Sequence, residues 1–210
     1  MNEARFKHKV IKLPSSTSLY DPVVQKEILT ALDIVKKQVT HPDVDALIFM
    51  QESSGLDYHA KWVQDCSRLL YDELSRNLTI LRNLVKHVLR TKVKTCYMFQ
   101  GNCLDSYFEL AMATDYRVAV DNRGFVGFPQ IDYGFYPGGG IFDSISKNHP
   151  LLKIDWRKRN KFSIEEALSI GLIHGCYISE VAIVLQTLQN RPKHLTDWAG
   201  DLSHEIEYPE

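Results

Sequence analysis

Hydrophobic residues recur along the chain with two different spacings, and together these predict alternating helices and strands. Asp21-Pro22 is a favourable helix start, and an apolar face at three- to four-residue spacing follows it. The apolar run 45–50 lies between turn-forming residues and predicts a buried strand, followed by a loop over 51–60. A longer amphipathic pattern over about 62–90 predicts one long helix.

Shorter elements are expected in the second half of the chain. The S-x-x-E pattern at Ser163–Glu166 predicts a capping box that opens a helix ending at Gly171. Strands alternating with helices, with no linker or repeat, predict one α/β domain over residues 1–210, with a mobile polar tail beyond Pro192. The other expected elements are strands at 92–99, 116–120, 125–128 and 175–178, helices at 107–113 and 179–190, a loop at 101–105, and a helical pattern after the glycines at 138–140.

The net charge and the lengths of the apolar runs argue against two classes of partner, nucleic acids and membranes. The 210 residues include 25 Lys and Arg against 26 Asp and Glu, so the formal charge of -1 argues against a nucleic-acid partner. No apolar run approaches the roughly 18 residues that a membrane span needs, and the first residues do not resemble a signal peptide. We therefore expect a soluble, cytoplasmic protein with reduced cysteines and no membrane partner.

Several common kinds of site are not supported by the sequence. The eight histidines include no i,i+4 pair and the four cysteines no C-x-x-C pair, so no metal site is expected. The chain has no G-x-S-x-G, G-x-x-x-x-G-K-[ST] or G-x-G-x-x-G motif. The commonest motifs of hydrolases, nucleoside triphosphatases and dinucleotide-binding proteins are therefore absent, which argues against these functions.

Two further features each allow two interpretations. The glycines Gly138–Gly140 could present backbone N–H groups to an anion, although a tight turn into a helix is the simpler interpretation. The basic stretch 153–161 could meet the phosphates of a ligand such as coenzyme A, although a solvated loop is the simpler account.

The segment 100–111 carries the clearest chemical pattern. A strand ends there, a polar loop turns, and a helix begins with Glu109 in its first turn. Free N–H groups at a helix start can stabilise an oxyanion, and a carboxyl group beside them can move a proton. The alternative is structural, because Ser106 and Glu109 also have the spacing of a capping box.

Three groups of motifs, in this order, resemble the crotonase (enoyl-CoA hydratase/isomerase) superfamily. Segment 99–119 contains FQG, ELAMA and TDYRVA, similar to the family's N-G-x-x-x-G-G-G-x-E-L-A and C/T-D-x-R-x-A. GFPQ at 127–130 and GFYPGGG at 134–140 resemble F-G-x-P-E and L-G-x-x-P-G-x-G-G. KFSIEEA at 161–167 and GLI at 171–173 resemble F-S-A-x-E-A and G-L-V. The likeness runs from the strand near Ala46 to about Ile178.

The resemblance implies a spiral of repeated strand-strand-helix units, here shortened at its C-terminal end, and assembly into homotrimers or dimers of trimers. Glu109 falls on the first catalytic glutamate, and Ser106 on a glycine whose N–H lines the oxyanion hole. Tyr58 is the expected second N–H donor. Gln130 replaces the second glutamate, and an amide cannot exchange a proton near neutral pH. Asp132 lies two positions after Gln130 and could face the same way as Gln130 in an extended segment, although a surface position is the simpler interpretation.

Two functions follow as hypotheses from the resemblance. The first is an enzyme of the lyase or isomerase type that converts an acyl-CoA, or an acyl-carrier thioester, through an oxyanion-stabilised enolate. It would need no tightly bound cofactor, since coenzyme A enters as part of the substrate. The second is a catalytically weak or inactive crotonase-fold paralogue that serves as a thioester-binding or assembly module.

Overall fold

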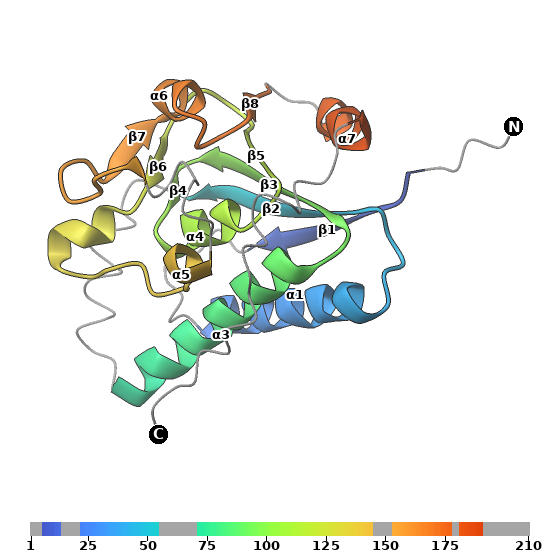
Figure 1. Cartoon of the computed structure of the whole chain (residues 1–210), viewed down its shortest axis with the longest axis horizontal. Coiled ribbons are helices and arrows are strands. Elements are labelled where there is room, and N and C mark those ends of the chain that lie inside the picture. Colours follow the sequence, from blue (N-terminus) through green and yellow to red (C-terminus); the bar gives the residue numbers. More distant parts are fainter. Residues whose placement is uncertain (1–5, 14–21, 55–70, 145–152, 178–180, 191–210) are drawn as a thin grey trace, which may run out of the picture.

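A five-stranded parallel sheet forms the centre of the molecule (Figure 1). The computed structural model describes residues 6–13, 22–54, 71–144, 153–177 and 181–190. Every neighbouring pair of strands in this sheet is parallel, as expected where connections cross over through helices. The strands, in spatial order, are β1 (His8–Leu13), β2 (Ala46–Ser54), β3 (Lys94–Gly101), β5 (Tyr116–Ala119) and β8 (Gly175–Cys176).

A smaller sheet of three strands lies beside it. Strand β4 (Cys103–Leu104) pairs in parallel with β6 (Phe125–Gly127), and β6 pairs antiparallel with β7 (Lys161–Ser163). The chain passes from β3 to β4 and then into helix α4 (Ser106–Met112), and from β5 to β6 and then into the 3-10 helix η1 (Pro129–Tyr133) and α5 (Ile141–Ser144). This alternation between sheets confirms the expected strand-strand-helix units.

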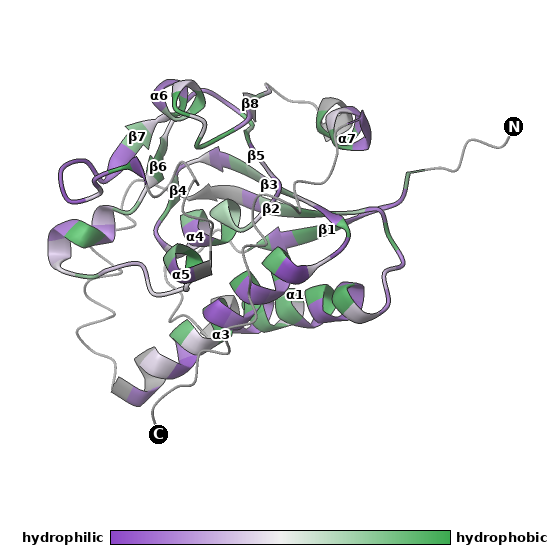
Figure 2. Ribbon diagram, in the orientation of Figure 1, coloured by the Kyte–Doolittle hydropathy of each residue, from purple (hydrophilic) through white to green (hydrophobic). Residues whose placement is uncertain are grey.

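Helices cover both faces of the larger sheet. Helices α1 (Pro22–Thr40) and α3 (Tyr71–Arg90) pack on one face, and each carries hydrophobic and hydrophilic residues on different sides (Figure 2). Alternate residues of β2 point to opposite faces, so Leu47 and Phe49 join the cluster under α1 and α3. Ile48 instead joins a smaller cluster under α7 (Val181–Asn190).

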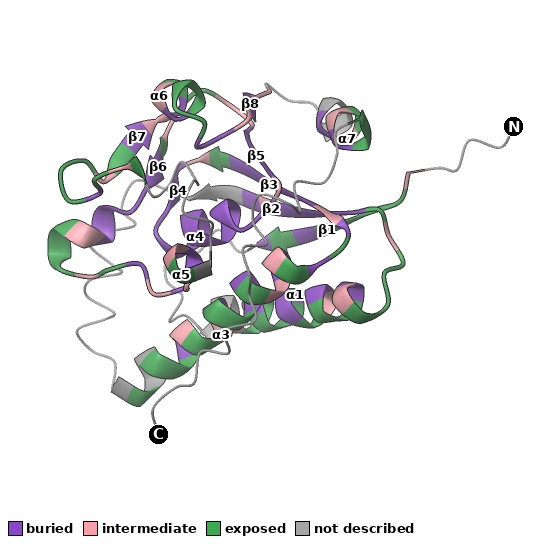
Figure 3. Cartoon of the chain, viewed as in Figure 1, coloured by how far each residue is buried: buried purple, intermediate pink, exposed green. Residues whose placement is uncertain are grey.

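Helix α4 is buried along its whole length, as Figure 3 shows. It contacts β4, β5, α3 and α5. A seven-residue helix contributes little stability by itself, because helix nucleation is costly and short helices are marginal in water. Its conformation is therefore maintained by the surrounding elements, which also fix the direction of every side chain it carries.

A buried arginine joins β5 to the segment that precedes β8. The Arg117 side chain donates to the carbonyl oxygens of Leu172 at 2.7 Å and Thr114 at 2.8 Å. Its backbone carbonyl accepts from the N–H of His174 at 2.8 Å. Burial lowers the pKa of Arg117 to about 10, so the guanidinium remains charged at neutral pH. These carbonyl oxygens compensate the charge that has been removed from water.

Several element boundaries differ from the sequence prediction. Strand β1 was not expected, because four of its six residues are exposed and it lacks an apolar run. The predicted loop 101–105 contains the two-residue strand β4, which is too short for a periodic signal. Strand β2 continues to Ser54, into the predicted loop 51–60. Helix α3 begins at Tyr71, and residues 62–70 of the predicted long helix lie outside the described residues.

The predicted capping box at the start of α6 (Ile164–Ser169) is confirmed. The backbone N–H of Glu166 donates to Oγ of Ser163 at 3.3 Å, and the N–H of Ser163 donates to Oε2 of Glu166 at 2.9 Å. Gly171 follows the helix with a φ of 77°, a conformation that favours glycine.

Replacing the capping serine should weaken the fold measurably. We expect Ser163→Ala to lower the free energy of unfolding by about 0.5–2 kcal/mol, because an orphan N–H of the first turn loses its acceptor. Urea unfolding of the purified chain measures this change. Ser75→Ala, on the exposed side of α3, is the matched control and should cost nothing. Equal midpoints for the two variants would show that the capping box does not stabilise the protein.

Candidate active site

Glu109 lies at the centre of the candidate site, and its side chain is 1% exposed. Its carboxyl group is directed at the three glycines before α5, Gly138–Gly140, which we call the glycine segment. A methyl group added at Gly139 would lie 2.7 Å from Oε2 of Glu109. Only glycine allows this approach, since nonbonded heavy atoms settle at about 3.5–4.0 Å. The glycines therefore bring backbone N–H groups to a carboxyl group of the protein itself.

The environment of Glu109 favours its protonated form. Burial raises the pKa of Glu109 to about 8. The backbone N–H groups of Gly139 and Ile141 act to lower this pKa, whereas the charge of Asp105 raises it further. Within the described residues, Oε2 has no hydrogen-bond partner of normal geometry. A carboxyl group that titrates near neutral pH is suited to giving and taking a proton.

The start of α4 does not form the capping box that the spacing of Ser106 and Glu109 allowed. Asp105 is the N-cap residue, and no side chain caps the helix. The carboxyl group of Glu109 turns to the glycine segment instead of to the Ser106 backbone. Ser106 is the first residue of the helix and is 4% exposed, and its N–H lies in the first turn, where helices have no intrahelical acceptor.

Asp105 is a second buried carboxyl group in this region. It is completely buried, and its Oδ1 accepts the backbone N–H of Gln130 at 3.0 Å. Burial raises the pKa of Asp105 to about 7, although the N–H of Gln130 acts to lower it. No local pattern in the sequence marks the Asp105 side chain, because its partner lies 25 residues later in the chain.

The other predicted site residues lie in different surroundings. Gln130 is 3% exposed in the first turn of η1, close to Asp105 through its backbone. Asp132 is exposed on the same 3-10 helix, which agrees with the surface interpretation. Tyr58 lies outside the described residues. The structure thus brings together the neighbourhoods of Ser106, Glu109 and Gln130.

A buried polar network supports the loop before α4. The hydroxyl of Tyr97 donates to Oε1 of Gln51 at 2.9 Å, and Nε2 of Gln51 donates to the carbonyl of Asn102 at 3.0 Å. The side chain of Asn102 in turn accepts the N–H of Phe125 at 2.9 Å. These bonds connect β2, β3 and β6 below the site. The one sequence signal for this network was the polar Gln51 directly after an apolar strand.

The basic stretch 153–161 has partners within the chain. Arg159 pairs with Glu166, and Lys158 lies 3.2 Å from Asp155. Lys161 lies over the ring of Phe125, 5.0 Å from its centre. These contacts agree with the simpler interpretation, a charged surface loop.

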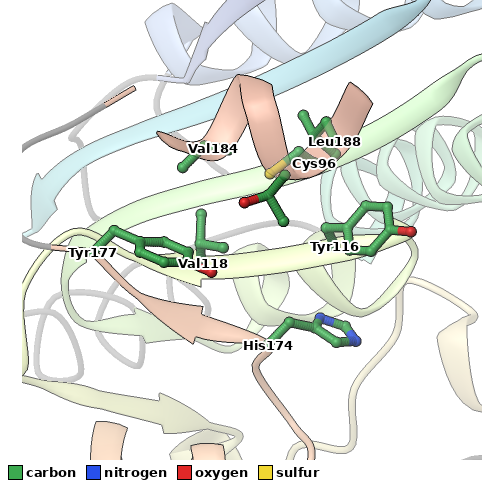
Figure 4. A pocket seen from close by; sticks show the side chains of 8 residues that line it. Cys96, Tyr116, Val118, His174, Tyr177, Val184 and Leu188 are labelled. Carbon is green, nitrogen blue, oxygen red and sulfur yellow. The ribbon is translucent and has the colours of Figure 1, made fainter. Parts of the chain in front are cut away.

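A small cavity lies on the other face of the larger sheet, between the strands and α7 (Figure 4). Its volume is about 10 Å³, comparable to one water molecule. Side chains of Cys96, Tyr116, Val118 and Leu188 line it together with His174. Because α4 packs with the opposite cluster, this cavity is separate from the site at Glu109.

Two absences apply to the described part of the chain. No group of three or more His, Cys, Asp or Glu side chains within it could hold a metal ion. None of its helices is both long enough and apolar enough to cross a bilayer.

Comparison with known sequences finds distant relatives of this chain. No family model matches the chain. The enoyl-CoA isomerase/hydratase fer4 of Mycosarcoma maydis is 22% identical over 137 residues. That match includes 63% of this chain, and the chain spans about half the length of the fungal protein.

Comparison with solved structures decides the fold. An enoyl-CoA hydratase from Bacillus anthracis matches with a TM-score of 0.68 at 15% identity, over 89% of this chain and 74% of its own. The chain has the crotonase fold. An enoyl-CoA hydratase/carnithine racemase from Magnetospirillum magneticum agrees, with a TM-score of 0.63 at 14% identity over 91% of this chain and 74% of its own. The fold that the motifs' resemblance to the crotonase superfamily implied is thereby confirmed.

The raised pKa of Glu109 predicts how stability depends on pH in this crotonase-fold protein. Between the ordinary value of 4.5 and about 8, the folded state holds a proton that the unfolded state has released. The free energy of unfolding should therefore fall as pH rises through this range, by up to about 1.4 kcal/mol per pH unit. Glu109→Gln should make the decline shallower. Asp105 contributes a similar decline up to about pH 7, which this variant retains.

Urea unfolding at several pH values between 5 and 9 measures this dependence. Glu165→Gln removes an exposed carboxyl group of the same type and is the matched control. If Glu109→Gln and the control follow the same curve as the unmodified chain, Glu109 is not buried as a protonated acid.

Proposed function

We propose that this protein acts on an acyl thioester, normally of coenzyme A, through an enolate, with Glu109 as the acid/base. The observation that supports this is a buried carboxyl group with a pKa of about 8, in the first turn of a buried helix of the crotonase fold. The name of the fungal relative, an enoyl-CoA isomerase/hydratase, supports the same substrate class. Coenzyme A would enter as part of the substrate, with no tightly bound cofactor.

In the proposed reaction, ionised Glu109 removes a proton from the saturated carbon beside the thioester carbonyl, in a substrate whose double bond begins at the next carbon. The electron pair of that C–H bond moves toward the carbonyl oxygen, which becomes an enolate. The N–H of Ser106, and with it the N–H of Tyr58, would stabilise the negative oxygen. Returning the proton from Glu109 to a different carbon completes a shift of the double bond, so atoms and charge balance without a further reactant.

Isomerisation suits this site better than hydration. A double-bond shift needs one group that removes a proton and later returns it, and Glu109 can carry out both transfers. Addition of water needs a second group to activate the water or protonate carbon, and Gln130 can orient a water molecule but cannot exchange its proton. The replacement at Gln130 therefore favours the isomerase type of reaction over the lyase type.

Solvent-exchange measurements test the shared enolate step, whatever the final product. In D₂O, the chain should incorporate deuterium into 3-enoyl- and saturated acyl-CoA substrates at the carbon beside the carbonyl, and the rate should rise with pH to a plateau above about 8. Glu109→Gln should slow exchange roughly 100- to 10,000-fold. Mass spectrometry measures incorporation, and the exposed-site variant Glu165→Gln should exchange like the unmodified chain. Exchange that does not depend on Glu109 would contradict the proposal.

Restoring the missing carboxyl group should change the product. We expect Gln130→Glu to raise the yield of the 3-hydroxyacyl product relative to the isomerised enoyl product, because a second acid/base becomes available for water. Chromatography of the products from one enoyl-CoA gives the ratio directly. An unchanged ratio in a variant that still isomerises would show that residue 130 does not face the reacting carbon atoms.

The burial of Glu109 favours a second candidate function. With 1% of its surface exposed, the carboxyl group is closed in by the glycine segment, as in a protein that retains a thioester-binding or assembly role without turnover. Calorimetric titration with acyl-CoA separates the candidates: binding without any Glu109-dependent exchange supports this second function, and binding with exchange supports the enzyme.

A further inference from the structure

Asp105 has a backbone conformation that normally requires glycine. Its φ of 54° and ψ of -123° make it the only residue other than glycine with a positive φ in the described part of the chain. Such a conformation is strained in residues that carry a side chain and persists only where surrounding contacts hold it. A side chain at this position therefore has to be stabilised by its interactions.

Three hydrogen bonds hold Asp105 in place, each to a different element. Its N–H donates to the carbonyl of Gly127 in β6 at 2.8 Å, and its own carbonyl accepts the N–H of Glu109 in α4 at 2.9 Å. The third bond uses the side chain, which accepts the N–H of Gln130 in η1 at 3.0 Å. A glycine could make the first two bonds but not the third.

The side-chain bond connects the two halves of the proposed site. On one side is the start of α4, with Ser106 and Glu109, and on the other is the start of η1, with Gln130. We propose that Asp105 is a positioning residue, whose carboxylate fixes the start of η1 against α4 and whose negative charge acts on Glu109. The catalytic consequence of this role rests on the proposed function.

The charge surroundings agree with this role. Cys103 on β4 is buried and neutral, since burial raises its pKa well above the usual range. Arg82 on α3, Asp132 on η1 and Asp143 on α5 are exposed to solvent, which screens them. Within the described residues, Asp105 is thus the buried charge that acts on Glu109.

The titrations of the two buried carboxyl groups are coupled. Burial raises the pKa of both groups, and a negative charge on Asp105 raises the pKa of Glu109 further. The observed titration belongs to the pair. Removing the charge at position 105 should therefore move the titration of Glu109 to lower pH.

Two variants separate the charge from the hydrogen bond. Asp105→Asn keeps an oxygen that can accept the N–H of Gln130 but removes the charge. Asp105→Gly removes both and also relieves the strained backbone, so the variant should fold. Asp132→Asn removes an exposed carboxylate from the neighbouring η1 and is the matched control.

The first measurement is a carboxyl-carbon NMR titration of Glu109, with its signal assigned by its absence in Glu109→Gln. We expect the titration midpoint to fall by roughly one pH unit in Asp105→Asn and not to move in Asp132→Asn. A midpoint in Asp105→Asn equal to that of the unmodified chain would overturn the electrostatic part of the inference. This measurement does not depend on activity.

The second measurement is the pH profile of deuterium exchange. The rising limb should move to lower pH in both Asp105 variants, and the plateau rate should fall roughly tenfold or more in Asp105→Gly relative to Asp105→Asn, with a smaller effect on KM. Equal plateaus would overturn the positioning part. If the unmodified chain shows no exchange while the NMR shift is present, the proposed function fails and the action of Asp105 on Glu109 stands.

Discussion

Complete burial of α4 is the constraint on which the rest of this structure depends. A helix of seven residues cannot stabilise itself, and all of its residues are buried, so neighbouring elements must satisfy its polar groups and fix its position. The N–H of Glu109 bonds back to Asp105, which in turn is held by β6 and η1. The site is therefore assembled by long-range contacts around one short helix.

Two ionisable side chains in the interior avoid an uncompensated charge in different ways. Arg117 stays charged and is surrounded by carbonyl oxygens. Glu109 instead holds its proton at neutral pH, against the glycine segment. The first arrangement is fixed and structural, whereas the second leaves a group that can change its protonation state within the physiological range. The buried Asp105 shares this property with Glu109, and groups perturbed in this way cluster at functional sites.

Sequence patterns correctly predicted the elements that depend on neighbouring residues. They did not predict structure that depends on contacts between residues far apart in the chain. The S-x-x-E spacing correctly predicted the capping box at Ser163, but the same spacing at Ser106 gave no box, because the carboxyl group of Glu109 is drawn to Gly139 instead. Strand β4 has only two residues and no periodicity to detect. The motifs predicted the fold and the neighbourhood of Glu109, whereas the role of the Asp105 side chain depends on a bond to Gln130 that no local pattern contains.

The bonds of Arg117 also have a consequence for synthesis of the chain. Leu172 and His174 lie 55 and 57 residues after Arg117, so a nascent chain that ends before them lacks two partners of the guanidinium. The nearby Thr114 carbonyl would still accept from it, but burying the charge with fewer partners is less favourable, which disfavours early closure of the sheet. We therefore expect final packing of β5 to be coupled to synthesis of the segment around residue 174.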